Sequence, residues 1–162
     1  FALQFAVMAG AEVFATSSSP AKLERLKALG AAHGVNYRED PDWGSTVLRM
    51  TGGRGIDHVV EVGGAGTLKQ SMRCLALGGT ISMIGVVAGP RAELNVPIVA
   101  MQDIAIRGVT VGPRSALERL VAAAEQHRLK PVIDRTFPLS ELRAALEYLE
   151  SGQHFGKVCI EI

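Results

Sequence analysis

Residues 12–31 read EVFATSSSPAKLERLKALGA, and this stretch decides the fold class. A short run rich in β-branched and aromatic residues ends in three serines, and a helical pattern follows at once. Ser19 is placed to cap that helix, Pro20 suits its first position, and Gly30 suits its end. The stretch therefore predicts a strand over 12–16 that runs directly into a helix, as in a βαβ unit.

The same alternation of short apolar runs and helical patterns continues along the chain. Most of the runs have apolar residues on both faces, as strands buried in a parallel sheet do. Further strands are predicted over 34–37, 57–62, 80–86 and 105–111. Helices are predicted over 66–77 and 115–126. The pattern favours an α/β fold with a doubly wound parallel (Rossmann) sheet.

The helix over 115–126 is predicted to open with a capping box formed by Ser115 and Glu118. Its core-facing side is expected to carry Leu117, Leu120, Val121 and Ala124. After about residue 130 the pattern changes: a strand is expected over 132–139, a helix over 141–152 and a last strand over 157–162. This tail could extend the same sheet or belong to a neighbouring domain.

Composition excludes several functions. A chain of 162 residues with 48% apolar residues suits one packed domain, and its net charge of +1 favours neither a nucleic-acid partner nor an anionic membrane. Cys74 and Cys159 lie far apart, and the four histidines lack ligand spacing, so neither a disulfide framework nor a metal site is predicted. A reducing, cytoplasmic location is therefore expected. Cys74 is expected to be a small core residue.

The phosphate-binding loop of a dinucleotide fold is missing from its expected place. In such a fold G-x-G-x-x-G comes about 20 residues before the residue that contacts the adenosine ribose. Counting back from Ser17 passes the start of the sequence, so residues 1–11 are expected to be the second half of the first helix, with the first strand and its loop upstream. VGGAGTLK (62–69) resembles the loop, but Lys69 stands where the third glycine should be. Such a turn could instead bring backbone close to a ligand or to a neighbouring turn.

Ser17 occupies the position where many dinucleotide-binding folds have an acid. An acid there accepts hydrogen bonds from the ribose hydroxyls and repels a 2′-phosphate. With Ser17 that repulsion is absent, and Lys22 in the first helical turn adds a positive charge. The plain alternative is a capped turn with a solvated lysine.

These segments together resemble the medium-chain dehydrogenase/reductase superfamily, in its zinc-type alcohol dehydrogenase-like and quinone oxidoreductase-like branches. The resemblance rests on AGAEVFATSSSPAKLERLKALGA, HGVNYRED, GGRGIDHVVEVGG, LALGGTISMIG, IRGVTVG and HFGKVCIEI, in this order. It implies that residues 1–130 are a partial NAD(P)-binding Rossmann domain without its first strand and glycine loop. It also implies that residues 131–162 return to a GroES-like catalytic domain.

The resemblance further implies a set of cofactor-binding residues at strand ends and at the start of the first full helix. On the adenosine side these are Ser17, Ser18, Lys22 and Tyr37, of which Tyr37 and the lysine would line a 2′-phosphate site. On the nicotinamide side they are Val62, Gly63, Gly64, Gly85, Val86, Val109 and Val111. Lys157 would approach the cofactor phosphates. Without the resemblance, Tyr37 would be read as a half-buried aromatic at a strand end.

The function that follows is the NADP(H)-binding portion of an oxidoreductase, with NADP(H) preferred over NAD(H). The parent protein would transfer hydride between NADPH and a small carbonyl, alcohol, enone or quinone. No catalytic residue is identified here, and zinc is possible only through the upstream half. The alternative is a non-catalytic nucleotide-binding module or an inactive fragment, and this chain alone is expected to be inactive.

Two further expectations concern related folds and assembly. The Y-x-x-x-K signature of short-chain dehydrogenases is missing, because Tyr37 and Tyr148 are followed four positions later by Pro41 and Gly152. A methyltransferase would share the sheet but would not account for the sequence RGVTVG. The resemblance implies a homodimer joined through the strand over 105–111.

Overall fold

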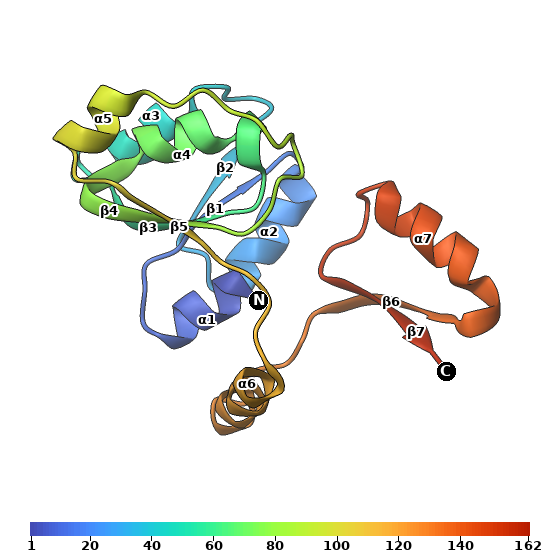
Figure 1. Cartoon of the computed structure of the whole chain (residues 1–162). Coiled ribbons are helices and arrows are strands. Elements are labelled where there is room, and N and C mark those ends of the chain that lie inside the picture. Colours follow the sequence, from blue (N-terminus) through green and yellow to red (C-terminus); the bar gives the residue numbers. More distant parts are fainter. The chain divides into compact units, whose positions relative to one another are not determined.

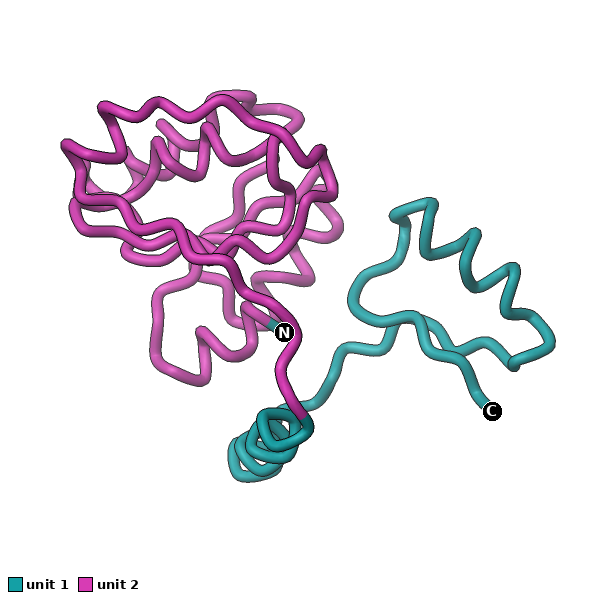
Figure 2. Tube along the Cα trace, in the orientation of Figure 1, with its two compact units in different colours: residues 1, 114–162 teal, residues 2–113 magenta.

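The computed structural model describes the whole chain, residues 1–162, as two compact units (Figure 2). One unit comprises residues 2–113, and the other comprises Phe1 with residues 114–162. The expected division at residue 130 concerns complete domains of a longer protein and stays a prediction.

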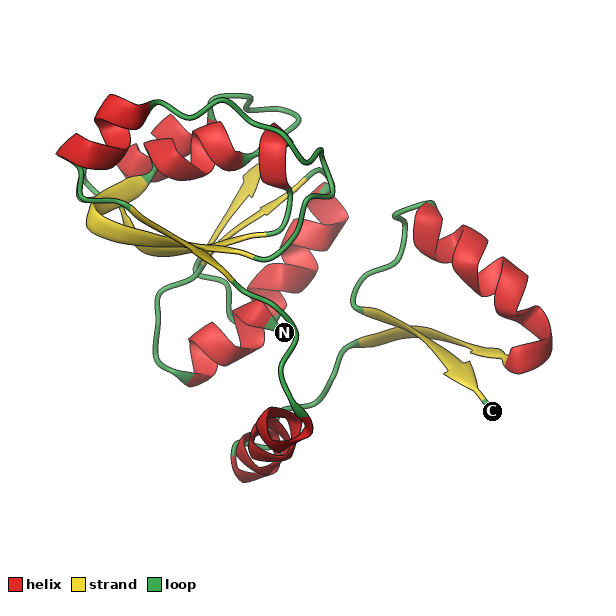
Figure 3. Ribbon diagram, in the orientation of Figure 1, coloured by secondary structure: helices red, strands yellow, loops and turns green.

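Helices and strands alternate through residues 2–113 (Figure 1). In order they are α1 (Ala2–Met8), β1 (Phe14–Ser17), α2 (Pro20–Ala28), β2 (His33–Asn36), α3 (Trp43–Met50), β3 (Ile56–Glu61), the 3-10 turn η1 (Gly64–Gly66), α4 (Leu68–Arg73), β4 (Leu75–Met83), α5 (Val96–Met101) and β5 (Ala105–Gly108). Helices α3, α4 and α5 cover one face of the strands, and α1 and α2 lie on the other (Figure 3). The predicted Rossmann-like arrangement of parallel strands between helices is confirmed.

All strand pairs in this unit are parallel, and their carboxyl ends share one edge. Ser17 of β1 is opposite Asn36 of β2, whereas Glu61 of β3 is opposite Met83 of β4. The strands form two groups, β1-β2 and β3-β4-β5, that are not hydrogen-bonded to each other. In a sheet of order 3-2-1-4-5-6 the strand between these groups is the first one. The expectation that this strand precedes Phe1 stays a prediction.

Two hydrophobic clusters hold the layers together. One joins both strand groups: Val35, Trp43, Val47 and Cys74 are buried together, with Phe14, Ile56 and Val59 packed against them. The other lies beneath α4 and comprises Leu68, Met72, Leu75, Ile81 and Ile104. Ile81 of β4 is completely buried. Cys74 is a core residue, as expected.

Helix α2 begins and ends as its sequence predicts. The Ser19 hydroxyl accepts a hydrogen bond from the backbone N–H of Lys22 at 3.4 Å, and Pro20 occupies the first helical position. Gly30 has φ of +102°, a conformation that glycine adopts without strain, and the chain turns there towards β2.

The prediction of one helix over 66–77 is wrong, because α4 ends at Arg73 and residues from Leu75 onward belong to β4. Leu75 pairs with Ile56 of β3 and is buried in the cluster beneath α4. Pairing with β3 and burial therefore override the helical spacing of this short segment. The strand predicted over 105–111 ends earlier, at Gly108.

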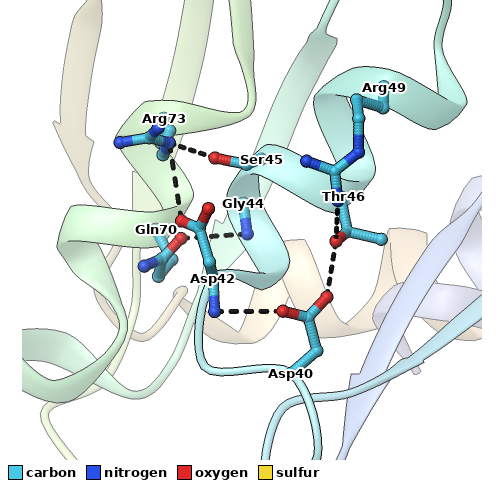
Figure 4. A network of polar contacts seen from close by, with 8 residues as sticks. All are labelled: Asp40, Asp42, Gly44, Ser45, Thr46, Arg49, Gln70 and Arg73. Atoms are coloured by element: carbon cyan, nitrogen blue, oxygen red, sulfur yellow. Dashed lines mark hydrogen bonds and ion pairs between the residues drawn. The ribbon is translucent and has the colours of Figure 1, made fainter.

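Helices α3 and α4 are locked together by polar contacts (Figure 4). The backbone N–H of Gly44 donates to Oε1 of Gln70 at 3.0 Å. The Arg73 guanidinium donates to the Ser45 hydroxyl and lies 3.5 Å from Oδ1 of Asp42. These contacts fix the start of α3, a helix that is not among those predicted from the sequence.

The second unit contains α6 (Arg114–Gln126), β6 (Ile133–Pro138), the 3-10 turn η2 (Leu139–Glu141), α7 (Leu142–Glu150) and β7 (Lys157–Glu161). Strands β6 and β7 pair in parallel with each other, and α7 connects them. Tyr148 of α7 donates to Oδ2 of Asp134 at 2.6 Å and thereby ties the helix to β6.

Two expectations for α6 are wrong. The helix begins at Arg114, whose Nε binds Oε1 of Glu118 at 2.8 Å, so Ser115 lies inside the helix and forms no capping box. No residue of α6 is buried, and its expected core-facing side chains Leu117, Leu120 and Val121 are exposed. An amphipathic pattern identifies the apolar side of a helix but not what covers it.

Candidate functional site

The carboxyl ends of β1 and β2 bring Ser17 and Tyr37 together. Ser17 is the last residue of β1, and Tyr37 follows the last residue of β2. The backbone N–H of Tyr37 donates to the carbonyl oxygen of Ser17 at 3.1 Å. The Tyr37 side chain is 41% exposed, so its phenol is accessible at this edge.

The serine turn also presents the start of α2 at this edge. The Ser17 hydroxyl accepts a hydrogen bond from the backbone N–H of Ser19 at 3.3 Å, which leaves its own proton for another acceptor. Ser18 and Lys22 are half-buried beside it, with Lys22 in the first turn of α2. Three of the four adenosine-side residues therefore lie where β1 runs into α2. Tyr37 is linked to them by the hydrogen bond from its backbone N–H to the Ser17 carbonyl.

At the end of β3, the residues that follow it form loop 62–67, which is organised by Glu61. One oxygen of this carboxylate, Oε1, accepts from the backbone N–H groups of Gly63 at 2.7 Å and Gly64 at 3.0 Å, and from the Thr67 hydroxyl at 2.5 Å. The other oxygen accepts from the Ser71 hydroxyl of α4. The N–H groups that a phosphate loop would offer are thus already occupied.

Loop 62–67 packs against loop 84–89, which follows β4. The Ala88 N–H donates to the Gly63 carbonyl at 2.7 Å, and the Ala65 N–H donates to the Gly89 carbonyl at 3.0 Å. A Cβ on Gly64 would lie 2.7 Å from the Gly89 carbonyl oxygen. The glycines of this turn therefore allow close approach to a neighbouring turn, one of the two roles that the sequence allowed. The predicted cofactor contacts of Gly63 and Gly64 stay predictions.

The predicted nicotinamide-side residues follow three adjacent strands. Val62 follows β3, Gly85 and Val86 follow β4, and Val109 and Val111 follow β5. The side chains of Val62 and Val86 are 53% and 57% exposed. The Val109 N–H already donates to the Met83 carbonyl at 2.9 Å, so its carbonyl is the backbone group left for a ligand.

Residues 1–126 match the model of one protein family, described as zinc-binding dehydrogenase. The chain belongs to the zinc-binding dehydrogenase family. This confirms the resemblance to zinc-type alcohol dehydrogenase-like proteins that the sequence motifs indicated.

Similar proteins agree with this membership. A zinc-type alcohol dehydrogenase-like protein of Schizosaccharomyces pombe is 48% identical over 166 residues, which cover 100% of this chain and 48% of that protein. A solved structure described as an alcohol dehydrogenase from Sinorhizobium meliloti is 45% identical with a TM-score of 0.92, covering 99% of this chain and 46% of the other. A solved NAD-dependent alcohol dehydrogenase is 37% identical with a TM-score of 0.91, covering 99% and 47%. The chain spans about half the length of these relatives.

The residues of this zinc-binding dehydrogenase chain do not form a zinc site. No three His, Cys, Asp or Glu side chains lie close enough together to hold a metal ion. Cys74 and Cys159 are free thiols, and burial raises the pKa of the Cys74 thiol to about 11, which favours the neutral form over the thiolate that binds metal.

Among the helices of the structure, none has the length and apolar character that a membrane-spanning helix needs.

Two other features lie apart from the carboxyl-end edge. A hollow of about 440 Å³ opens at the amino ends of β1 and β3, where Glu12, Phe14, Arg54 and Asp57 are among its lining residues. Ligands of open α/β sheets bind at the opposite, carboxyl edge. Lys157 begins β7 in the second unit, and its predicted role at the cofactor phosphates stays a prediction.

Sequence reasoning missed Glu61, Thr67 and Ser71 as residues that shape the site. The signal was present: an acid follows two valines at the end of the strand, and hydroxyl residues follow that acid six and ten positions later. A buried carboxylate needs such donors. Spacing alone did not reveal that all three would meet.

Proposed function

We propose that this chain is the nicotinamide-cofactor-binding part of an oxidoreductase, with NADP(H) preferred over NAD(H). The observation that carries the proposal is the pairing of Ser17 with Tyr37 at the carboxyl edge, where an acid would exclude a 2′-phosphate. Family membership and the Rossmann-like fold support the nucleotide-binding role.

Three local features support the preference for a 2′-phosphate. Ser17 is neutral and keeps a hydroxyl proton to donate. Lys22 lies in the first turn of α2, where the helix macrodipole is positive as well. Tyr37, which is 41% exposed, follows β2 at the same edge. A doubly negative phosphate would accept from all three groups.

The competing preference is NAD(H), because the similar solved alcohol dehydrogenase named above is NAD-dependent. A neutral Ser17 also tolerates an unphosphorylated ribose, so the positive charge of Lys22 decides between the two cofactors. Removing that charge is therefore the informative change.

Val62, Gly85 and Val86 are proposed to line the nicotinamide end. Their exposed apolar surface would exclude water and hold the ring in one orientation. When bound, the cofactor supplies or accepts the hydride, and the proposed substrate is a small carbonyl, alcohol, enone or quinone. The catalytic groups and any zinc would come from the rest of the parent protein. In the alternative, a module without catalysis, these residues would bind the cofactor but no turnover would follow.

We also propose that the protein is a homodimer in the cytoplasm. Strand β5 pairs only with β4, so its other edge is unpaired. Such an edge can pair with a second copy of the same strand. The free thiols of Cys74 and Cys159 support a reducing compartment.

The test is a set of titrations with NADPH and NADH that record the dissociation constant (Kd) for each. The wild-type protein is expected to bind NADPH at least about tenfold more tightly than NADH, a difference of about 1.4 kcal/mol. Lys22→Met should weaken NADPH binding by a similar factor and leave NADH unchanged. Lys27→Met is the matched control, because it removes one positive charge from the last turn of the same helix, away from the serine turn. Equal affinity for both cofactors would refute the NADP(H) preference, and binding of neither would refute the nucleotide-binding role.

A further inference from the structure

Glu61 is a buried acid whose contacts are all with neutral donors of its own site. It is 3% exposed. Its two carboxylate oxygens accept four hydrogen bonds, from the Gly63 and Gly64 N–H groups and the Thr67 and Ser71 hydroxyls. An ionised carboxylate only accepts hydrogen bonds, so this donor set suits it and would suit an amide poorly.

The strand determines where this carboxylate points. Side chains alternate between the faces of a strand, so Glu61 lies on the same face as Val59, which packs against the cluster beneath α4. Ser71 belongs to α4, and Thr67 immediately precedes that helix. The side chain therefore links the end of β3, loop 62–67 and α4.

The backbone of Glu61 binds the second loop. Its carbonyl oxygen accepts from the N–H of Ile84 at 2.8 Å and from the N–H of Gly85 at 3.3 Å. The Val87 N–H donates to the Val62 carbonyl at 3.2 Å, directly beyond this contact. One residue is thus hydrogen-bonded to both loops.

Glycines allow the backbones of the two loops to pack in direct contact. A Cβ on Gly85 would lie 2.6 Å from the Val62 carbonyl oxygen, and one on Gly66 would lie 2.7 Å from the Ala88 Cβ. With backbones this close, a change in loop 62–67 must move loop 84–89 as well. Val62, Gly85 and Val86 are held in one arrangement as a consequence.

The geometry points to Glu61 as a positioning residue that sets the nicotinamide end of the site, an inference that rests on the proposed cofactor role. The carboxylate does not touch the ligand. It holds the Val62, Gly85 and Val86 surface in the shape that receives the nicotinamide, whereas the adenosine end at Ser17 and Tyr37 is built independently of it.

The test compares two ligands that differ only at the nicotinamide end. NADPH carries the nicotinamide ring. The ligand 2′-phospho-ADP-ribose lacks this ring but keeps both riboses and the adenosine end. The ratio of their Kd values measures what the nicotinamide contributes. In the wild-type protein NADPH is expected to bind at least tenfold more tightly. In Glu61→Gln that ratio should fall to within twofold of one, while the affinity for 2′-phospho-ADP-ribose stays within twofold of the wild-type value.

Ser45→Ala is the matched control, since it removes a buried hydroxyl that accepts from Arg73 between α3 and α4, outside both loops. It should leave the ratio unchanged. If Glu61→Gln does not fold, Thr67→Val and Ser71→Ala each remove one donor to the carboxylate and should each lower the ratio at least threefold.

Two results would overturn the inference while leaving the proposed function intact: an unchanged ratio in the Glu61, Thr67 and Ser71 variants, or an equal loss of affinity for both ligands. Failure of the wild-type protein to bind either ligand would overturn the proposed function, and this inference with it.

Discussion

The backbone N–H of Tyr37 is hydrogen-bonded to the carbonyl oxygen of Ser17 at 3.1 Å, across the carboxyl ends of two parallel strands. This bond places the backbones of the two residues side by side where many dinucleotide-binding folds have a carboxylate. The two residues are 20 positions apart in the chain, and the parallel register of β1 and β2 brings them together.

Restoring the acid should reverse the proposed cofactor preference. Asp at position 17 would repel a 2′-phosphate and accept from both ribose hydroxyls, so Ser17→Asp should weaken NADPH binding by at least about tenfold, equivalent to 1.4 kcal/mol. NADH binding should be unchanged or tighter. The control is titration of Ser17→Asn, because Asn has the size of Asp without its charge. The comparison separates charge repulsion from the effect of side-chain size. NADPH affinity that is equal in the Asp and Asn variants would contradict the electrostatic explanation.

Gly44 allows α3 and α4 to approach closely, as Figure 4 shows. A Cβ at this position would come well under 3.0 Å from the backbone oxygen of Gln70. We expect Gly44→Ala to lower the free energy of unfolding by about 1–3 kcal/mol, because the helices must separate. Urea denaturation measures this. Gly108→Ala is the control, since nothing lies within 4 Å of its added Cβ; equal losses in both variants would argue against steric overlap.

Cys74 makes stability depend on pH in the alkaline range. Burial raises the pKa of its thiol from 9.0 to about 11. Between these values the folded protein keeps a proton that the unfolded chain has lost, so stability falls as pH rises through this window and is fully present below pH 9. The full effect is on the order of 3 kcal/mol.

The measurement is a pair of urea denaturation series, for wild type and Cys74→Ala, from pH 7 to 10.5. The variant should be less stable at pH 7, because it leaves a small cavity, and the gap should narrow above pH 9. Between pH 7 and 8 the thiol does not titrate, so the difference in unfolding free energy between the two proteins should be constant there. This constant difference serves as the internal control. A gap that stays constant up to pH 10.5 would show that the thiol titrates alike in both states.

The proposed dimer should depend on the free edge of β5. Ile106 of β5 is 39% exposed, and a lysine there would disfavour strand pairing between copies. Light scattering should give a dimeric mass for the wild type and a monomeric mass for Ile106→Lys. Met101→Lys changes an exposed residue at the end of α5 and should remain dimeric. A monomeric wild-type protein at micromolar concentration would rule out the dimer.

Local sequence patterns were sufficient to predict the order of the strands, the helix that follows the first of them and the parallel fold class. These depend on local patterns: Ser19 and Pro20 start α2 through backbone geometry, and runs of β-branched residues favour buried strands. The same patterns failed where distant contacts dominate. Leu75 joins β4 because it pairs with Ile56, and Glu118 binds Arg114 where a capping box was expected.

Sequence patterns identified only part of the candidate site, because some of its contacts also join residues that are distant in the chain. Ser17 could be identified as a candidate from its position at the end of a predicted strand, whereas Tyr37 was a candidate only through the family resemblance. The packing of the turn after β3 on its neighbour depends on contacts that form only in the folded chain. The Gly63 and Gly64 N–H groups are satisfied by Glu61, and a hydrogen bond that closes across a fold depends on three-dimensional proximity, which residue spacing along the chain does not encode.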